Sequence, residues 1–80
     1  MAEEFQVTQT LDTKGLSCPI PILKTKRAMD AMAKDQVLKV LTTDPGSQKD
    51  MPAWANRTGN VLLKVEENPG VFTFYIRKAG

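Results

Sequence analysis

The segment at residues 15–27, GLSCPIPILKTKR, constrains the fold of this chain more than any other stretch. It holds the only cysteine, Cys18, which is followed by Pro19 and Pro21 and then by a pattern that can be helical. Proline suits the first turn of a helix, because the N–H that it lacks would have no partner there. The residue before a proline is pushed away from helical geometry. The segment therefore predicts a helix that begins at Pro19, with a distorted first turn, or at Pro21, with the Cys18 thiol at its start.

A thiol at this position is expected to be reactive. The unpaired N–H groups of a helix N-terminus carry partial positive charge, which favours a thiolate, the nucleophilic form of cysteine. Within the next two turns, Lys24, Lys26 and Arg27 add full positive charges. These three cations form either a solvated helix face or a docking site for an acidic partner. Free cysteine is commonly an inert buried residue, but we favour a functional Cys18 because of its place at a proline-opened helix.

Composition narrows the possible classes of protein. Eighty residues make one small domain, residues 1–80, with a thin core. A single cysteine indicates a reducing compartment. The lack of histidine and of a second cysteine argues against an ordinary zinc site and a Cys-His catalytic pair. No apolar run suggests a signal peptide or a membrane span. The net charge of +2, with acids and lysines interspersed, implies neither nucleic acid nor an acidic membrane surface as a partner.

Hydrophobic spacing in the first half of the chain predicts a strand, a helix and a second strand. Residues 5–11 alternate, with Phe5, Val7, Gln9 and Leu11 on one face. The helix is expected to run to residue 33 or 34, with Met29 and Met32 as core filler and Leu23 widening its apolar arc. The continuously apolar run at residues 37–43 predicts an interior strand.

The second half predicts a short helix and a hairpin. Ser47 and Asp50 have the spacing of a capping box, and Gly59 can end this helix after residue 57 or 58. A third strand is expected at residues 60–66, and a fourth at residues 71–77, with residues 78–80 as a frayed tail. On the third strand, one face should carry the alternate apolar residues Val61, Leu63 and Val65. On the fourth, Phe72, Phe74 and Ile76 should share a face. Trp54 is interpreted as a core residue, and Pro52 is tolerated only near the first turn of a short helix.

The order β-α-β-α-β-β predicts an α/β two-layer sandwich, with two helices packed on one face of a four-stranded mixed sheet. Right-handed crossovers bring the ends of the first two strands and the starts of both helices to one edge. Cys18 and Asp44 should both emerge at that edge, where Asp44 is expected to form a turn.

A carrier of sulfane sulfur must expose a thiolate, hold the sulfur as a persulfide and present it to another protein. A second thiol nearby would attack the persulfide and release its sulfur. The sequence meets these demands, since Cys18 is alone, precedes a helix and has cations nearby.

The motifs resemble those of the TusA-like sulfur-carrier family, also called SirA-like. The resemblance covers nearly the whole chain and rests on Leu11-Asp12, Gly15-Leu16-Ser17-Cys18-Pro19-Ile20-Pro21-Ile22-Leu23, Thr43-Asp44-Pro45 and Tyr75-Ile76-Arg77-Lys78. It implies a two-layer sandwich, a cytoplasmic location and the relay of persulfide sulfur. The donor would be a cysteine desulfurase or a rhodanese-type protein, and the acceptor a downstream sulfurtransferase. The pathway would be tRNA thiolation, molybdenum-cofactor assembly or sulfur oxidation.

The resemblance also implies roles for individual residues. Cys18 matches the sulfur-carrying cysteine of the family, and Pro19 and Pro21 match its two prolines. Asp44 matches the acidic residue before the proline that opens the second helix. No metal and no cofactor beyond the covalent persulfide is expected. The protein should be a monomer that forms transient complexes, contacts no nucleic acid or membrane, and turns over nothing alone.

Two other functions remain open from the residues. A noncatalytic regulatory or interaction module could bind protein or nucleic acid through the basic first helix, although no aromatic residues are interleaved with its cations. A thiol peroxidase or redox sensor would need a resolving thiol from another chain. Replacing Cys18 with serine separates these functions, because a binding module would keep its function and a carrier would lose it.

Overall fold

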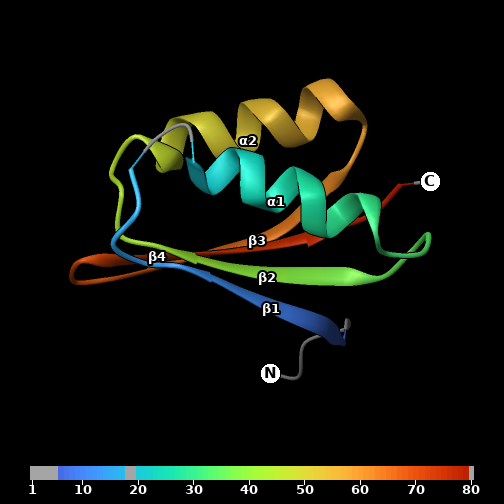
Figure 1. The fold of residues 1–80 in the computed structure, drawn as a ribbon, viewed down its shortest axis with the longest axis horizontal. Coiled ribbons are helices and arrows are strands. Elements are labelled where there is room, and N and C mark those ends of the chain that lie inside the picture. The colour runs from blue at the N-terminus through green and yellow to red at the C-terminus, as the bar shows by residue number, and fades with distance from the viewer. Residues whose placement is uncertain (1–5, 18–19, 80) are drawn as a thin grey trace.

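The computed structural model describes residues 6–17 and 20–79. The elements are β1 (Val7–Thr13), α1 (Ile20–Asp30), β2 (Val37–Thr42), α2 (Ser47–Thr58), β3 (Val61–Asn68) and β4 (Val71–Arg77). Both helices lie on the same face of the sheet (Figure 1). The predicted order and the two-layer architecture are therefore confirmed.

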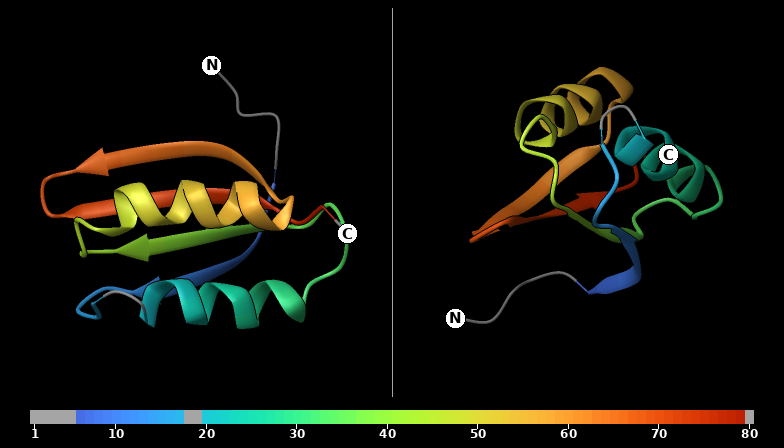
Figure 2. Two further views of the ribbon diagram at one scale, coloured as in Figure 1. Left: turned by 90° about the horizontal axis from the view of Figure 1, so that it is seen from above. Right: turned by 60° about the vertical axis from the view of Figure 1, so that its left-hand side comes forward.

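The sheet is mixed, as predicted, with strand order β1-β2-β4-β3. β1 and β2 run parallel because α1 crosses back between them, whereas β4 is antiparallel to both β2 and β3. Consequently β1 and β2 end at the same end of the molecule, where α1 and α2 begin (Figure 2). This end is the predicted edge.

The core fills the space between the sheet and the two helices. The face that β4 turns to the helices carries Phe72, Phe74 and Ile76, as predicted, and Trp54 is buried opposite them with 5% of its surface exposed. Alternate residues of β2 and the apolar stripes of both helices complete the core. Its buried members are Met29, Met32, Leu38, Val40, Met51, Trp54, Ala55, Phe72, Phe74 and Ile76.

Both edge strands contain an irregularity that the alternation of residues does not predict. In β3, Leu62 pairs with Ile76 while Lys64 pairs with Tyr75, so one extra residue sits between them. This bulge places Leu62 on the helix side, with Val65 farther along, and turns Val61 to the opposite side. The expectation that Val61, Leu63 and Val65 share a face is therefore wrong.

The irregularity in β1 has the same consequence. The register shifts between Val7, which pairs with Val37, and Leu11, which pairs with Val40. Since Val37 and Val40 are three residues apart on one strand, they face opposite sides of the sheet. Val7 and Leu11 therefore do not share a face as expected, and the predicted partner Phe5 lies outside the described residues.

Helix α1 ends at Asp30, three or four residues earlier than predicted. The N–H groups of Ala31 and Met32 donate to the carbonyls three residues back, at 3.2 and 3.0 Å, which tightens the end of the helix. Asp35 then takes a φ of 71°, a left-handed conformation that turns the chain into β2.

The C-terminal tail is anchored at Lys78, so the expectation of a frayed end is wrong for this residue. Its backbone N–H donates to the Gln36 carbonyl at 2.9 Å, and its carbonyl accepts from the Asp35 N–H at 2.8 Å. Its ammonium donates to the carbonyls of Met29 and Met32 at 2.7 and 2.8 Å. These carbonyls belong to the end of α1, where a cation also complements the helix dipole.

Helix α2 ends as predicted, because Gly59 takes a φ of 80° and its N–H donates to the Asn56 carbonyl at 3.2 Å. Pro52 lies in the second turn of α2. The helix has twelve residues, so it is longer than the short helix expected from a proline at this position.

The sheet face away from the helices carries a chain of polar contacts. One Glu66 carboxylate oxygen accepts from the Tyr75 hydroxyl at 3.0 Å, and the other lies 3.1 Å from the Lys64 ammonium. The Lys39 ammonium lies 5.7 Å from the centre of the Tyr75 ring. The hydrogen bond from Lys64, followed by that from Tyr75, lowers the pKa of Glu66 below its ordinary value.

Candidate functional site

The candidate site lies where α1 and α2 begin, at the ends of β1 and β2 (Figure 2). Cys18 and Pro19 are outside the described residues, so the predicted exposure and ionisation of the Cys18 thiol stay predictions. The residues on either side are described: the Ile20 N–H donates to the Ser17 carbonyl at 2.9 Å. Helix α1 begins at Ile20, between the two predicted starting points.

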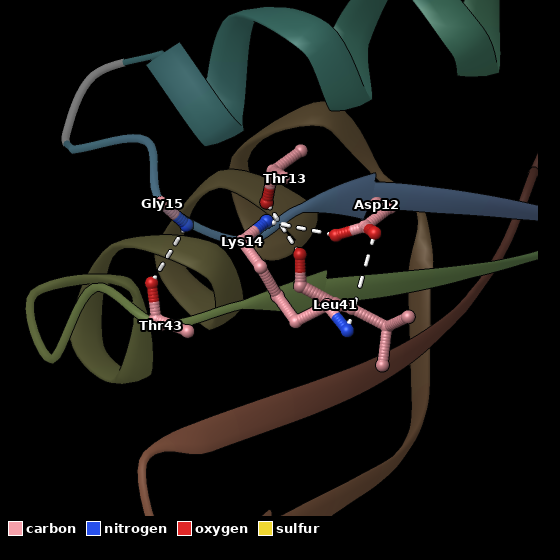
Figure 3. Close-up of polar contacts among 6 residues, drawn as sticks. All are labelled: Asp12, Thr13, Lys14, Gly15, Leu41 and Thr43. Atoms are coloured by element: carbon pink, nitrogen blue, oxygen red, sulfur yellow. Dashed lines mark hydrogen bonds and ion pairs between the residues drawn. The ribbon is translucent and has the colours of Figure 1, made fainter.

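The loop that leads to Cys18 is fastened to the end of β2 (Figure 3). The Thr13 hydroxyl donates to the Leu41 carbonyl at 2.5 Å, and the Gly15 N–H donates to the Thr43 hydroxyl at 2.9 Å. Gly15 has a φ of 85°, which only glycine adopts readily. The loop therefore leaves β1 in a fixed direction.

Local contacts complete the turn out of β1. The Asp12 carboxylate accepts from the Lys14 N–H at 2.9 Å, and the Leu16 N–H donates to the Thr13 carbonyl at 3.2 Å (Figure 3 shows the first contact). The Asp12 of the Leu-Asp motif thus shapes the turn that precedes the cysteine.

The first turn of α1 has a buried side that fixes it to the core. Pro21 is buried in this turn, as its helix-starting role requires, and its carbonyl accepts from the buried Thr25 hydroxyl at 2.7 Å. The opposite side of the turn is open, with Ile20 40% and Leu23 53% exposed. Leu23 therefore lies outside the buried part of the apolar arc expected for this helix, and the helical spacing does not predict the exposed apolar pair that it forms with Ile20.

The predicted cations lie on the exposed surface of α1, but they are not equivalent. Lys26 forms an ion pair with Asp30 at 3.1 Å, one helical turn away. Lys24 and Arg27 instead continue the helical spacing of Ile20 and Leu23. We call Ile20, Leu23, Lys24 and Arg27 the α1 outer stripe. It begins two residues after Cys18 and combines apolar and basic side chains.

Asp44 forms the turn before α2, as predicted. Its N–H donates to the Thr42 hydroxyl at 3.1 Å, and its carboxylate accepts from the Gly46 N–H at 3.2 Å. Its carbonyl accepts from the Ser47 N–H at 3.0 Å. This turn makes Gly46 the N-cap and leaves the helix without a side-chain cap, so the capping box expected for Ser47 and Asp50 is wrong.

The described part of the chain shows neither a metal site nor a membrane-spanning helix. Residues 6–17 and 20–79 bring together no three side chains of the types that hold a metal ion. Neither helix in these ranges has the length and apolar character that crossing a bilayer requires.

Comparison with known proteins extends this picture. The family model described as "Sulfurtransferase TusA" matches residues 9–78. The chain is 51% identical over 71 residues to the "Sulfur carrier protein TusA" of Allochromatium vinosum, covering 89% of this chain and 93% of that one. It is 36% identical over 75 residues to the protein of the same name from Pseudomonas putida, covering 94% of each chain.

A longer relative and a solved structure agree with these matches. A protein of Aquifex aeolicus is 48% identical over 77 residues, which are 96% of this chain and 39% of that one, so the chain spans about two fifths of its length. The crystal structure of the SirA-like protein from Desulfitobacterium hafniense has a TM-score of 0.76 and 26% identity, covering 90% of this chain and 99% of that one. The family match over residues 9–78 includes the turn before the cysteine, both helices and the Lys78 anchor. The chain belongs to the TusA family.

Proposed function

We propose that this protein is a sulfur carrier that accepts sulfane sulfur on Cys18 as a persulfide and passes it to a downstream sulfurtransferase. The observation that carries the proposal is the position of α1, which begins two residues after Cys18 at the end of the sheet. Its N-terminus favours a thiolate, and Lys24 and Arg27 add positive charge on the outer stripe. Membership of the TusA family supports the same role.

The proposed transfer needs no cofactor, oxidant or reductant. The Cys18 thiolate attacks the outer sulfur of a persulfide on the donor, so an S–S bond forms at Cys18 while the S–S bond of the donor breaks. The donor leaves as a thiolate. The same exchange then moves the sulfur to a thiolate of the acceptor and restores the Cys18 thiolate. Because Cys18 is the only cysteine, no second thiol of this chain competes for the persulfide.

The α1 outer stripe is the proposed docking surface for both partners. Ile20 and Leu23 offer exposed apolar contact, and Lys24 and Arg27 offer charges that attract an acidic surface. Lys26 contributes less, since Asp30 already pairs with it. We propose a cysteine desulfurase or rhodanese-type donor and a sulfurtransferase acceptor. Because both must reach the same sulfur, their complexes with a monomeric carrier would be transient and mutually exclusive.

The reactivity of the persulfide and the identity of the acceptor bear on the compartment and the pathway. A persulfide survives best where it meets no oxidant, so we propose the cytoplasm as the working compartment. The acceptor determines whether the sulfur enters tRNA thiolation, molybdenum-cofactor assembly or sulfur oxidation.

Mass spectrometry tests the proposal directly. After incubation with a cysteine desulfurase and cysteine, Cys18 should gain the mass of one sulfur atom, and a reductant should remove it. The Cys18→Ser variant is the control and should gain nothing. A wild-type protein that gains no sulfur from either a desulfurase or a rhodanese-type donor would contradict the proposal.

A further inference from the structure

The sheet face away from the helices carries a row of mostly apolar residues far from the candidate site. Both helices lie on the other face of the sheet (Figure 1). Strand pairing brings Val7, Val37, Arg77 and Val61 into register on β1, β2, β4 and β3, in that order across the sheet. Val7 and Val37 begin β1 and β2, whereas the candidate site lies where these strands end. We call these four residues the distal row.

Exposed apolar side chains gather in two places, and the distal row is one of them. Within the described residues, the large apolar side chains that are exposed are Val7, Ile20, Leu23, Val61 and Val65. Ile20 and Leu23 belong to the α1 outer stripe. Val7 and Val61, at 40% and 38% exposed, form the two ends of the distal row. Because the solvent face of a sheet normally carries polar side chains, this row offers apolar contact area that the fold leaves uncovered.

The distal row also has a positively charged centre. Arg77 is exposed and forms no ion pair within the described residues. The next row of the same face adds Lys39 and Lys64, on the strands either side of β4. The described acids of this face, Asp12 and Glu66, lie one row farther toward the candidate site, and Glu66 is paired with Lys64 at 3.1 Å. The distal part of the face is therefore basic and attracts an acidic surface.

The spacing of the distal row fits an α-helix laid across the strands. Neighbouring strands lie about 4.8 Å apart, so Val37, Arg77 and Val61 follow Val7 at about 5, 10 and 14 Å along the row. Helix residues i, i+4, i+7 and i+11 share one face, and the last three follow the first at about 6, 10.5 and 16.5 Å. An extended segment places side chains on one face about 6.6 Å apart, so it drifts out of step with the row sooner.

We propose that the distal row docks an amphipathic helix of another protein, with apolar side chains at i, i+4 and i+11 and a carboxylate at i+7. The apolar side chains contact Val7, Val37 and Val61. The carboxylate pairs with Arg77. Neither helix of this chain has that pattern, so a second copy cannot supply it. A protein bound here leaves the start of α1 accessible, and the use of that access in sulfur transfer is the only point that rests on the proposed function.

The fluorescence anisotropy of a labelled synthetic peptide tests the inference. The peptide is an alanine- and glutamine-based helix of about 18 residues, with leucine at i, i+4 and i+11 and glutamate at i+7. Its affinity should fall about tenfold for Arg77→Glu, because like charges then face each other. A peptide with lysine in place of the glutamate should recover most of this loss, which also shows that the variant is folded. Arg57→Glu makes the same change at an exposed position of α2 and should leave the affinity unchanged.

Two valines of β3 give a matched pair of variants. Val61→Thr replaces a methyl group by a hydroxyl in the distal row and should weaken peptide binding about threefold. Val65 is exposed on the other side of the same strand, so Val65→Thr should bind the peptide like the wild type. Leu23→Gln distinguishes the distal row from the α1 outer stripe and should also bind like the wild type.

Four outcomes would overturn the inference. The first is a wild-type protein that does not bind the glutamate peptide, and the second is equal weakening by Val61→Thr and Val65→Thr. The third is weakening by Leu23→Gln, which would place the peptide on the α1 outer stripe. The fourth is a wild-type dimer in sedimentation that Arg77→Glu makes monomeric, because the occupant would then be a second copy. None of these measurements needs sulfur on Cys18, so their failure leaves the proposed carrier function standing.

Discussion

Replacing Lys78 with methionine should destabilise the protein markedly, although the residue lies near the end of the chain. The substitution keeps the length of the side chain and removes its ammonium, which donates to the Met29 and Met32 carbonyls at 2.7 and 2.8 Å. A hydrogen bond to a charged group contributes about 1.5–3 kcal/mol. Because one ammonium makes both bonds and is half-buried, we expect a loss of about 2–3 kcal/mol rather than the full sum.

This loss is large for a domain of this size. A chain of 80 residues has a free energy of unfolding of about 4–12 kcal/mol at the usual value per residue. The expected fall in Tm is about 10–20 °C, since a domain of this size loses about 4–8 °C for each kcal/mol. The backbone bonds of Lys78 to Asp35 and Gln36 remain in the variant, so the effect isolates the ammonium at the end of α1.

Urea unfolding followed by the fluorescence of Trp54, the only tryptophan, measures this change. Lys49→Met is the matched control, because Lys49 is exposed on α2, and it should shift stability by less than about 0.5 kcal/mol. Lys78→Arg should retain part of the stability. If Lys78→Met unfolds at the same urea concentration as the wild type, the ammonium does not hold the end of α1 and the reasoning fails.

Three other changes have expected outcomes. Gly15→Ala should cost about 1–2 kcal/mol in urea unfolding, because φ is 85° there although space for a Cβ is open; an unchanged midpoint would contradict this. Lys64 and Tyr75 hold the pKa of Glu66 below its ordinary value of 4.5, so its stabilising effect is present at neutral pH and is lost as the pH falls below that value. Stability measured from pH 6 down to pH 3 should therefore fall less steeply in Glu66→Gln, and equal slopes would refute the assignment. Leu23→Gln on the α1 outer stripe, which adds no charge, should slow sulfur transfer from the donor about tenfold while leaving iodoacetamide alkylation of Cys18 unchanged; a parallel loss in both assays would point to damage at the thiol instead of lost docking.

The sequence predicts the order of the elements and the edge at which the site lies because those features depend on local chemistry. The two prolines after the cysteine restrict where the helix can begin, and α1 begins between the two starting points that they define. The turn at Asp44 and the left-handed Gly59 end or begin α2 for reasons that a few residues contain. At the site itself, Pro21 and Asp44 lie where their types require, while Cys18 and Pro19 stay predictions.

Two of the features that the sequence does not predict depend on contacts between residues far apart in the chain. The bulge beside Leu62 depends on the register of β3 against β4. The alternation of apolar and polar residues along β3 does not determine that register. The ammonium of Lys78 donates to the carbonyl of Met29, which is 49 positions away in the sequence. The three polar or small residues at the C-terminus give no local sign of this contact, so the sequence predicts a frayed tail. Ser47 failed as a capping residue because the Asp44 turn starts the helix one residue earlier than its spacing suggests.

The two sides of α1 divide stability from recognition. Its buried side is fixed at both ends, by Thr25 bonding to the Pro21 carbonyl in the first turn and by Lys78 closing the last. The loop before the cysteine is fixed separately, by the Gly15 bond to Thr43. Because none of these anchors uses a side chain of the outer stripe, the stripe can change without loss of the fold. Under the proposed function this separation is useful, because the stripe is then free to match a donor and an acceptor while the loop before Cys18 and the start of α1 are held by the anchors.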